Sequence, residues 1–144
     1  MSELSFAPVG WIDIALRLGI ALLVGGIIGW ERETKSKPAG LRTNMLVCFG
    51  SALFVLIPIE IGAAQQNIDV LGRVISGVAG GIGFIGGGTI LRNHRVHGLT
   101  SAAAIWVSAA LGVAVGCGLW QLGLIGALIV CIVLRAFGRW ENYL

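Results

Sequence analysis

Two pairs of oppositely charged residues lie at the start of apolar stretches of this chain. Asp13 and Arg17 form one pair, and Asp69 and Arg73 form the other. Residues at i and i+4 share one face of a helix, so each acid can reach its base. A charge inside a membrane span is costly and normally faces protein or a water-filled cavity. Each pair is therefore interpreted either as a structural clamp or as part of a path for an ion or a proton.

Acidic residues near the same predicted helix ends suggest a second kind of chemistry. Asp13 and Asp69 begin two apolar stretches, and Glu60 lies near the end of another. If these ends meet, the three carboxylates form an acidic rim, and Mg²⁺ binds through carboxylates and retained waters. Asp13, Glu60 and Asp69 are therefore candidate metal ligands. Mg²⁺ is a conceivable ligand, but the sequence requires no cofactor.

The composition places the chain in a membrane. Its 144 residues are 56% hydrophobic and 12% charged, and their mean hydropathy is +0.90. Soluble domains carry about 25% charged residues, and an apolar run of 18 or more residues can cross a hydrocarbon core of about 30 Å. We therefore predict an all-α, polytopic bundle of transmembrane helices. The net charge of +3 is confined to a few loops and does not indicate nucleic acid.

The chain is expected to be a single transmembrane domain, residues 1–144, with no soluble domain. Tryptophans support the placement of its spans, because Trp11 and Trp30 are separated by about one hydrocarbon thickness, as interfacial anchors are. The five predicted spans are residues 12–30, 41–62, 70–91, 99–118 and 121–137.

Basic residues between the spans give an expected orientation. Segment 31–42 carries four lysines and arginines, segment 92–98 carries two, and Arg135 and Arg139 follow at the end of the fifth span. The opposite ends of the spans carry acids and no loop bases. By the positive-inside rule, the N-terminus lies outside and the C-terminus in the cytoplasm.

The two charged pairs belong to an apparent internal repeat. "DIALR" and "DVLGR" each precede a glycine-containing span, a basic loop and a returning span that begins G-L-x-[ST]. The offset is 56 residues at the aspartates and 58 at Gly40 and Gly98. We interpret the chain as two parallel helical hairpins followed by a fifth helix, an arrangement known in transporters.

The third span is rich in glycine, and two interpretations stay open. Small residues four apart allow close helix packing or dimerisation. Alternatively, the segment "GIGFIGGG" unwinds and exposes carbonyl groups to a bound ion. The glycines assigned to packing are Gly77, Gly80, Gly81, Gly83 and Gly87.

The basic ends of the helices offer an anion site. Thr43 and Thr100 lie at helix starts, where hydroxyls can cap and exposed amides attract anions. Arg42 and Arg92 would suit a phosphate or a carboxylate, although contact with anionic lipid head groups explains the same bases. No arrangement of a nucleophile with a base appears in the sequence, so catalysis is not expected.

Two long segments, "GWERETKSKPAGLRTNMLVCFGSALF" (29–54) and "RVISGVAGGIGFIGGGTILRNHRVHGLTSAAAIWVSAALGVAVG" (73–116), resemble the MgtC/SapB family of bacterial membrane proteins. The combination of E-R-E, A-G-L-R-T, G-I-G-F-x-G-x-G and G-L-T-[ST]-A-A-x-x-W is specific, and the resemblance covers about residues 12–137. The motif positions carried over are Arg32, Glu33, Gly40, Leu41, Arg42, Thr43, Arg73, Gly81, Gly83, Phe84, Gly86, Gly88, Gly98, Leu99, Thr100 and Trp106.

The resemblance implies a multi-pass protein of the plasma membrane with a role in growth at low magnesium. Well-known members support survival inside macrophages and restrain the F-type ATP synthase. This chain is expected to lack the soluble C-terminal domain that they append, and Asn93 stands where some members carry an acid. The leading hypothesis is a regulatory protein of magnesium homeostasis that forms a homo-oligomer. Its alternatives are a modulator of another membrane complex and a cation or proton transporter that uses the Asp/Arg pairs.

Overall fold

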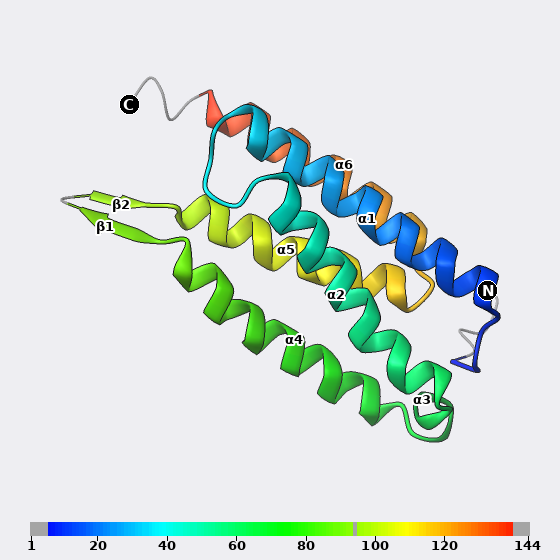
Figure 1. Ribbon diagram of the computed structural model, residues 1–144. Helices are drawn as coiled ribbons and strands as arrows, with labels where there is room; N and C mark the ends of the chain where they lie inside the picture. The colour runs from blue at the N-terminus through cyan, green and yellow to red at the C-terminus, as the bar shows by residue number, and fades with distance from the viewer. Residues whose placement is uncertain (1–5, 94, 140–144) are drawn as a thin grey trace.

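The computed structural model describes residues 6–93 and 95–139, which form a bundle of long helices (Figure 1). The prediction of an all-α polytopic bundle is confirmed, since five helices are long and apolar enough to cross a membrane. These five are α1 (Trp11–Thr34), α2 (Leu41–Glu60), α4 (Asp69–Gly88), α5 (Leu99–Gly116) and α6 (Trp120–Gly138). The short elements are α3 (Ala63–Gln66) and the antiparallel strands β1 (Leu91–Asn93) and β2 (Arg95–His97).

Helices α2 and α5 form the centre of the bundle. About half of each apolar span is buried, 50% for α2 and 56% for α5, whereas the other three spans are 17–28% buried. Helix α1 contacts both central helices and α6, and α4 contacts both central helices from the other side. Figure 1 accordingly shows α1 and α6 along one edge and α4 along the other. The outer helices therefore present most of the surface available to lipid.

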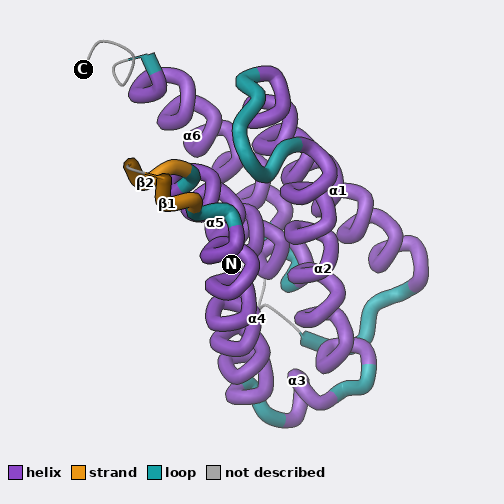
Figure 2. The backbone as a smooth tube through the Cα atoms, turned by 60° about the vertical axis from the view of Figure 1, so that its left-hand side comes forward, coloured by secondary structure: helices purple, strands orange, loops and turns teal. Residues whose placement is uncertain are grey.

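The bundle has two chemically different ends. We call the end formed by the 35–40 loop, the β1–β2 hairpin and the last turn of α6 the basic end; it is on the left in Figure 1. The start of α1, the α3 segment and the turn 117–119 form the opposite end. Figure 2 shows the hairpin projecting beyond the helices at the basic end.

Close approach around α2 depends on glycines of both neighbouring helices. A Cβ atom on Gly25 of α1 would lie 2.8 Å from the Cα of Met45, and one on Gly112 of α5 would overlap the carbonyl of Cys48. Small residues allow such contact between backbones, and in a membrane this contact replaces the hydrophobic effect as the force that joins helices. The backbone of α2 is therefore enclosed on two sides by glycine-bearing faces.

Several helix boundaries differ from the predicted spans, including those of α1, α2 and α4. Helix α1 continues four residues beyond Trp30, because Glu31 and Arg32 are buried against other helices rather than released into a loop. Helix α2 ends at Glu60, and α3 is a separate turn. Helix α4 ends at Gly88, since Leu91 pairs with His97 in the hairpin. This hairpin has three residues in each strand, too short for an alternating pattern to reveal it.

The contacts of the two predicted hairpins follow one scheme. Helices α1 and α4 each contact both α2 and α5, as two repeats related by a pseudo-twofold axis would. The duplication itself stays a prediction, as does the extent of the single domain.

The structure excludes one interpretation of the glycine-rich helix and limits the other, whose dimerisation alternative stays a prediction. Helix α4 is continuous from Asp69 to Gly88, so the unwound segment is wrong. Packing of its glycines within the chain is also wrong, because a Cβ atom on Gly77, Gly80, Gly81, Gly83 or Gly87 would meet no atom within 4 Å. Gly86 is the α4 glycine that faces a neighbour, with Ala102 of α5 at contact distance. The packing glycines of the described bundle lie on α1, α5 and α6 instead.

Candidate functional site

The predicted pair of Asp13 and Arg17 does not form. Arg17 Nη1 donates a hydrogen bond of 2.9 Å to the carbonyl oxygen of Gly116, at the end of α5. The last carbonyl groups of a helix lack partners within it and carry partial negative charge. Arg17 therefore joins α1 to the C-terminus of α5, which makes it a structural residue rather than half of an ion pair.

The second pair and the acidic rim do not assemble either. Asp69 and Arg73 are both exposed on α4, and the ion pairs between described residues are formed by Glu31 instead. Glu60 accepts a hydrogen bond from the amide of Val9, at 2.9 Å from Oε1. Within residues 6–93 and 95–139, no three His, Cys, Asp or Glu side chains lie together as a metal site. The proposed Mg²⁺ ligands Asp13, Glu60 and Asp69 are thus not gathered in this chain.

Buried charges gather at the basic end. Glu31 is 1% exposed, and its Oε1 lies 2.6 Å from Lys35 Nζ, one helical turn further along α1. Arg32 is 4% exposed, and its Nη1 lies 3.9 Å from Glu31 Oε2. An ionised carboxylate is stable inside a protein only when opposite charges accompany it. The last turn of α1 thus holds one buried acid between two bases.

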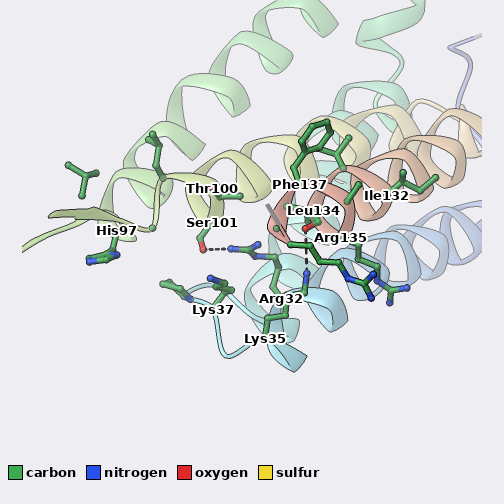
Figure 3. Close-up of a pocket in the computed structure, with 18 residues that line it drawn as sticks. Arg32, Lys35, Lys37, His97, Thr100, Ser101, Ile132, Leu134, Arg135 and Phe137 are labelled. Carbon is green, nitrogen blue, oxygen red and sulfur yellow. Dashed lines mark hydrogen bonds between the residues drawn. The ribbon is translucent and has the colours of Figure 1, made fainter. Parts of the chain in front are cut away.

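Arg32 connects this cluster to the start of α5. Its Nη2 donates a hydrogen bond of 2.7 Å to Ser101 Oγ, and both residues are buried (Figure 3). The arginine and the first turn of α5 are therefore held in a fixed relation, as expected for a charge-assisted hydrogen bond in a dry environment. This contact joins two motifs of the sequence, E-R-E and G-L-T-S.

Asn44 is a site residue that the sequence analysis missed. It is fully buried, and its Nδ2 donates to the carbonyls of Ala39 and Gly40, both at 2.9 Å. Its Oδ1 accepts a hydrogen bond of 2.8 Å from Ser108 Oγ on α5. The side chain thereby fixes the 35–40 loop against the central helix pair. A polar residue inside each of two apolar spans was the available signal, since such residues face protein.

Glu33 caps a helix, a role that the sequence analysis assigned to the hydroxyls of Thr43 and Thr100. Its Oε2 accepts a hydrogen bond of 2.9 Å from the amide of Leu41 at the start of α2. Neither α2 nor α5 has a side-chain cap at the preceding residue, so Thr43 and Thr100 do not cap these helices. Both helices begin one residue after a glycine, Gly40 or Gly98, and Gly98 adopts φ +88°, which favours glycine.

The remaining residues that the sequence analysis placed at the basic ends of the helices are dispersed. Arg42 is exposed on α2 and does not line the groove described below, whereas Leu99 and Thr100 line it. Arg92 belongs to β1, and its side chain lies outside the described part of the structure. The structure thus unites Arg32, Glu33, Gly40 and Leu41 at the α1–α2 junction, whereas the exposed Arg42 is not part of the groove lining.

A groove of about 1540 Å³ opens at the basic end (Figure 3). Its walls are the end of α1 with the loop that follows it, the residues around the start of α5, and the last turns of α6. Its described lining carries basic side chains and no aspartate or glutamate. These basic residues are Arg32, Lys35, Lys37, His97, Arg135 and Arg139. Arg32 reaches the groove from the buried cluster, so the groove and the cluster are one continuous site.

Comparison with known proteins finds a protein family whose model covers these motifs. The model of the MgtC family matches residues 18–143, which include the buried cluster, the α1–α2 junction and the start of α5. This chain belongs to the MgtC family. The resemblance noted in the sequence is thereby confirmed over nearly the whole chain.

Three relatives show the range of similarity. SrpB of Synechococcus elongatus is 47% identical, and the alignment covers 95% of this chain and 82% of SrpB. The Escherichia coli K12 protein named "Putative magnesium transporter YhiD" is 42% identical and aligns with 87% of this chain and 60% of its own length. MgtC of Salmonella typhimurium is 40% identical and aligns with 90% of this chain and 55% of its own length. The chain therefore spans less than two thirds of the latter two relatives. No solved structure matches it significantly.

Proposed function

We propose that this member of the MgtC family acts in magnesium homeostasis and in adaptation to low magnesium, as a regulatory protein that carries no ion. Family membership supports the connection, together with the relative YhiD, whose name refers to magnesium transport. The proposed site is the basic end, where Arg32 and Glu33 join three helices. We further propose that the chain has no catalytic step and requires no cofactor.

The location of the buried charged residues supports regulation over transport. In the part of the chain that the structure describes, the buried charged residues are Glu31 and Arg32, both at the basic end. Toward the opposite end, the core consists of apolar side chains such as Val55, Ile59 and Val115. A transport path needs polar or ionisable groups along the thickness of the membrane. Asp13, Asp69 and Arg73 are exposed in the single chain, so they line no path within its own bundle.

The free face of α4 supports a partner within the membrane. Its open glycines lie beside exposed side chains such as Phe84, which is 87% exposed. We propose that a second copy of the chain packs on this face. A different membrane complex, such as the ATP synthase that well-known family members restrain, is the alternative occupant. Nucleic acid is not among the proposed partners.

We also propose that the protein resides in the bacterial plasma membrane with its N-terminus outside and its C-terminus in the cytoplasm. The distribution of charge supports this orientation, because the basic end carries the lysines and arginines of the loops. The proposed regulatory surface then faces the cytoplasm.

Reconstitution tests the proposal directly. The purified full chain is placed in liposomes that contain a magnesium-sensitive dye, with empty liposomes as background and a reconstituted magnesium channel as positive control. We expect no uptake above background from protein that remains folded. Saturable uptake that Asp69→Asn abolishes would overturn the proposal in favour of a transporter that uses the charged residues.

A growth assay separates the two classes of surface. In a strain that lacks this protein and depends on it at low magnesium, the wild-type chain should restore growth. We expect Asp69→Asn to restore growth as well, whereas Gly80→Leu should fail, because the added side chain blocks close approach to α4. The opposite ranking of these two variants, at equal amounts in the membrane, contradicts the regulatory role of α4.

A further inference from the structure

The groove at the basic end has a one-sided charge that the positive-inside rule alone does not require. That rule places lysines and arginines on the cytoplasmic side of a membrane, but it does not require them to line one groove. Here lysines and arginines from two separate parts of the chain line one groove, Lys35 and Lys37 after α1 and Arg135 and Arg139 on and after α6, and His97 lines it beside them. Arg42 is also exposed at the same end, and it lies outside the groove. Only some of the exposed basic residues at this end therefore line the groove.

The described acids of the region lie outside the lining, and Lys37, Arg135 and Arg139 form no ion pair with a described residue. The carboxylate of Glu31 is buried behind the lining and pairs with Lys35. Glu33 turns toward the amide of Leu41 at the start of α2. Like charges lining one concave surface raise the local concentration of counter-ions. The described lining thus favours a negatively charged ligand.

One wall of the groove is continuous with the lipid-facing surface. Ile132, Val133 and Phe137 of α6 line the groove and are 57%, 48% and 65% exposed. Further along the same helix, Ile125 and Ile129 are also exposed. A ligand in the groove therefore meets bases at one side and an apolar helix surface at the other. Figure 3 shows this combination, with Arg32, Lys35 and Lys37 across from the turns of α6 that carry Ile132 and Phe137.

The volume of the groove fits a ligand larger than a free inorganic anion. Small-molecule sites enclose about 300–1,000 Å³, and this open groove measures about 1540 Å³. A phospholipid places its phosphate and glycerol at the interface and its chains along the helices. Basic sites between helices on the cytoplasmic side are known to bind such head groups.

We propose that the groove binds an anionic phospholipid of the surrounding leaflet, with the phosphate near Lys37 and Arg135 and one acyl chain along α6. The bound lipid fills the space between the 35–40 loop and the last turns of α6. Lys35 already joins these segments, since its Nζ lies 3.4 Å from the carbonyl of Leu134. The lipid therefore stabilises the same contact. This inference depends on membrane embedding and does not depend on a role in magnesium homeostasis.

Native mass spectrometry of the full chain, in a detergent with an uncharged head group, provides the test. The probes are phosphatidylglycerol and phosphatidylcholine with identical acyl chains. We expect saturable binding of phosphatidylglycerol at least about tenfold tighter than that of phosphatidylcholine. Each Lys or Arg near an anionic surface contributes enough to change affinity about fivefold. Arg135→Gln should therefore weaken phosphatidylglycerol binding about fivefold, and Lys37→Gln/Arg135→Gln about 25-fold.

Matched controls decide between a site and a general charge effect. Arg42→Gln removes the same charge from the same end outside the groove and should change affinity less than about twofold. Equal weakening by Arg42→Gln, or equal affinity for the two lipids, overturns the proposal. Displacement of phosphatidylglycerol by millimolar inorganic phosphate also overturns it, because the ligand is then a free anion. Thermal unfolding confirms that each variant is folded, and the single variant Arg135→Gln carries the test if the double variant is not.

Discussion

At the scale of single residues, neighbours rather than sequence context decide what a charge does. Arg17 and Arg73 occupy equivalent positions in "DIALR" and "DVLGR". Arg17 meets the carbonyl of Gly116, because α1 packs beside the end of α5, whereas Arg73 is exposed on an outer helix. The sequence analysis paired each arginine with the aspartate four residues before it, and neither ion pair forms. The i, i+4 spacing permits an ion pair, but water or a better acceptor can replace it.

The buried carboxylate of Glu31 gives a prediction at this scale. Replacing it by Gln removes the carboxylate beside the buried guanidinium of Arg32, and removing one partner of a buried ion pair costs about 3–5 kcal/mol. We expect Glu31→Gln to lower the free energy of unfolding in detergent by about 3 kcal/mol. Thermal or denaturant unfolding followed by circular dichroism provides the measurement.

Glu33→Gln is the matched control for Glu31. It makes the same chemical change two residues away but keeps an oxygen for the amide of Leu41, so its effect should stay within about 0.5 kcal/mol. The double variant Glu31→Gln/Lys35→Met should lose less stability than the sum of the two single variants, because the pair is coupled. Strict additivity would show that the ion pair contributes nothing.

At the scale of helices, the position of a glycine matters more than the number of glycines. The densest glycine run lies in α4, yet most of its glycines face open space. The glycines that bring backbones together are sparser: Gly25 on α1 and Gly112 on α5, on either side of α2. A small-xxx-small pattern shows that a helix can approach another closely, but it does not name the partner. The glycine-rich face of α4 is therefore open to close packing against another chain.

This difference predicts opposite effects of the same substitution. Gly112→Ala places a methyl group against the Cys48 carbonyl, and overpacking of this kind costs about 1–3 kcal/mol. Gly80→Ala meets no atom within the chain and should be neutral or stabilise the helix by up to about 1 kcal/mol. Unfolding of the detergent-solubilised monomer measures both. Gly50→Ala, at an open position on α2, reports the effect of alanine alone.

At the scale of the whole molecule, charge separates the two ends of the bundle. The described bases of the loops and of the last turn of α6 lie at the basic end, whereas Asp13, Glu60 and Asp69 lie at the opposite end. The packing of the helices does not depend on which end faces the cytoplasm. The orientation is set instead during insertion, when segments rich in Lys and Arg are retained on the cytoplasmic side.

Cysteine labelling in intact cells tests this orientation. In a background in which the native cysteines are replaced, Ser36→Cys marks the basic end and Gln65→Cys marks the opposite end, and both positions are exposed. We expect a membrane-impermeant maleimide to label Gln65→Cys in intact cells and Ser36→Cys only after permeabilisation. The reverse pattern would place the buried cluster and the groove outside the cell.

The sequence by itself determined the class of fold, the number of spans and the family, because hydropathy and motifs are local properties of the chain. Five apolar stretches must become helices, since a membrane leaves no other way to satisfy so many backbone groups. Only the tertiary structure decided which glycines pack, that Arg17 binds a carbonyl, and that Arg32 meets Ser101, 69 residues away. These contacts join helices distant in sequence, and their geometry depends on how whole helices pack. Asn44 and Ser108 were visible as polar residues, but their hydrogen bond exists only because α2 and α5 form the centre of the bundle.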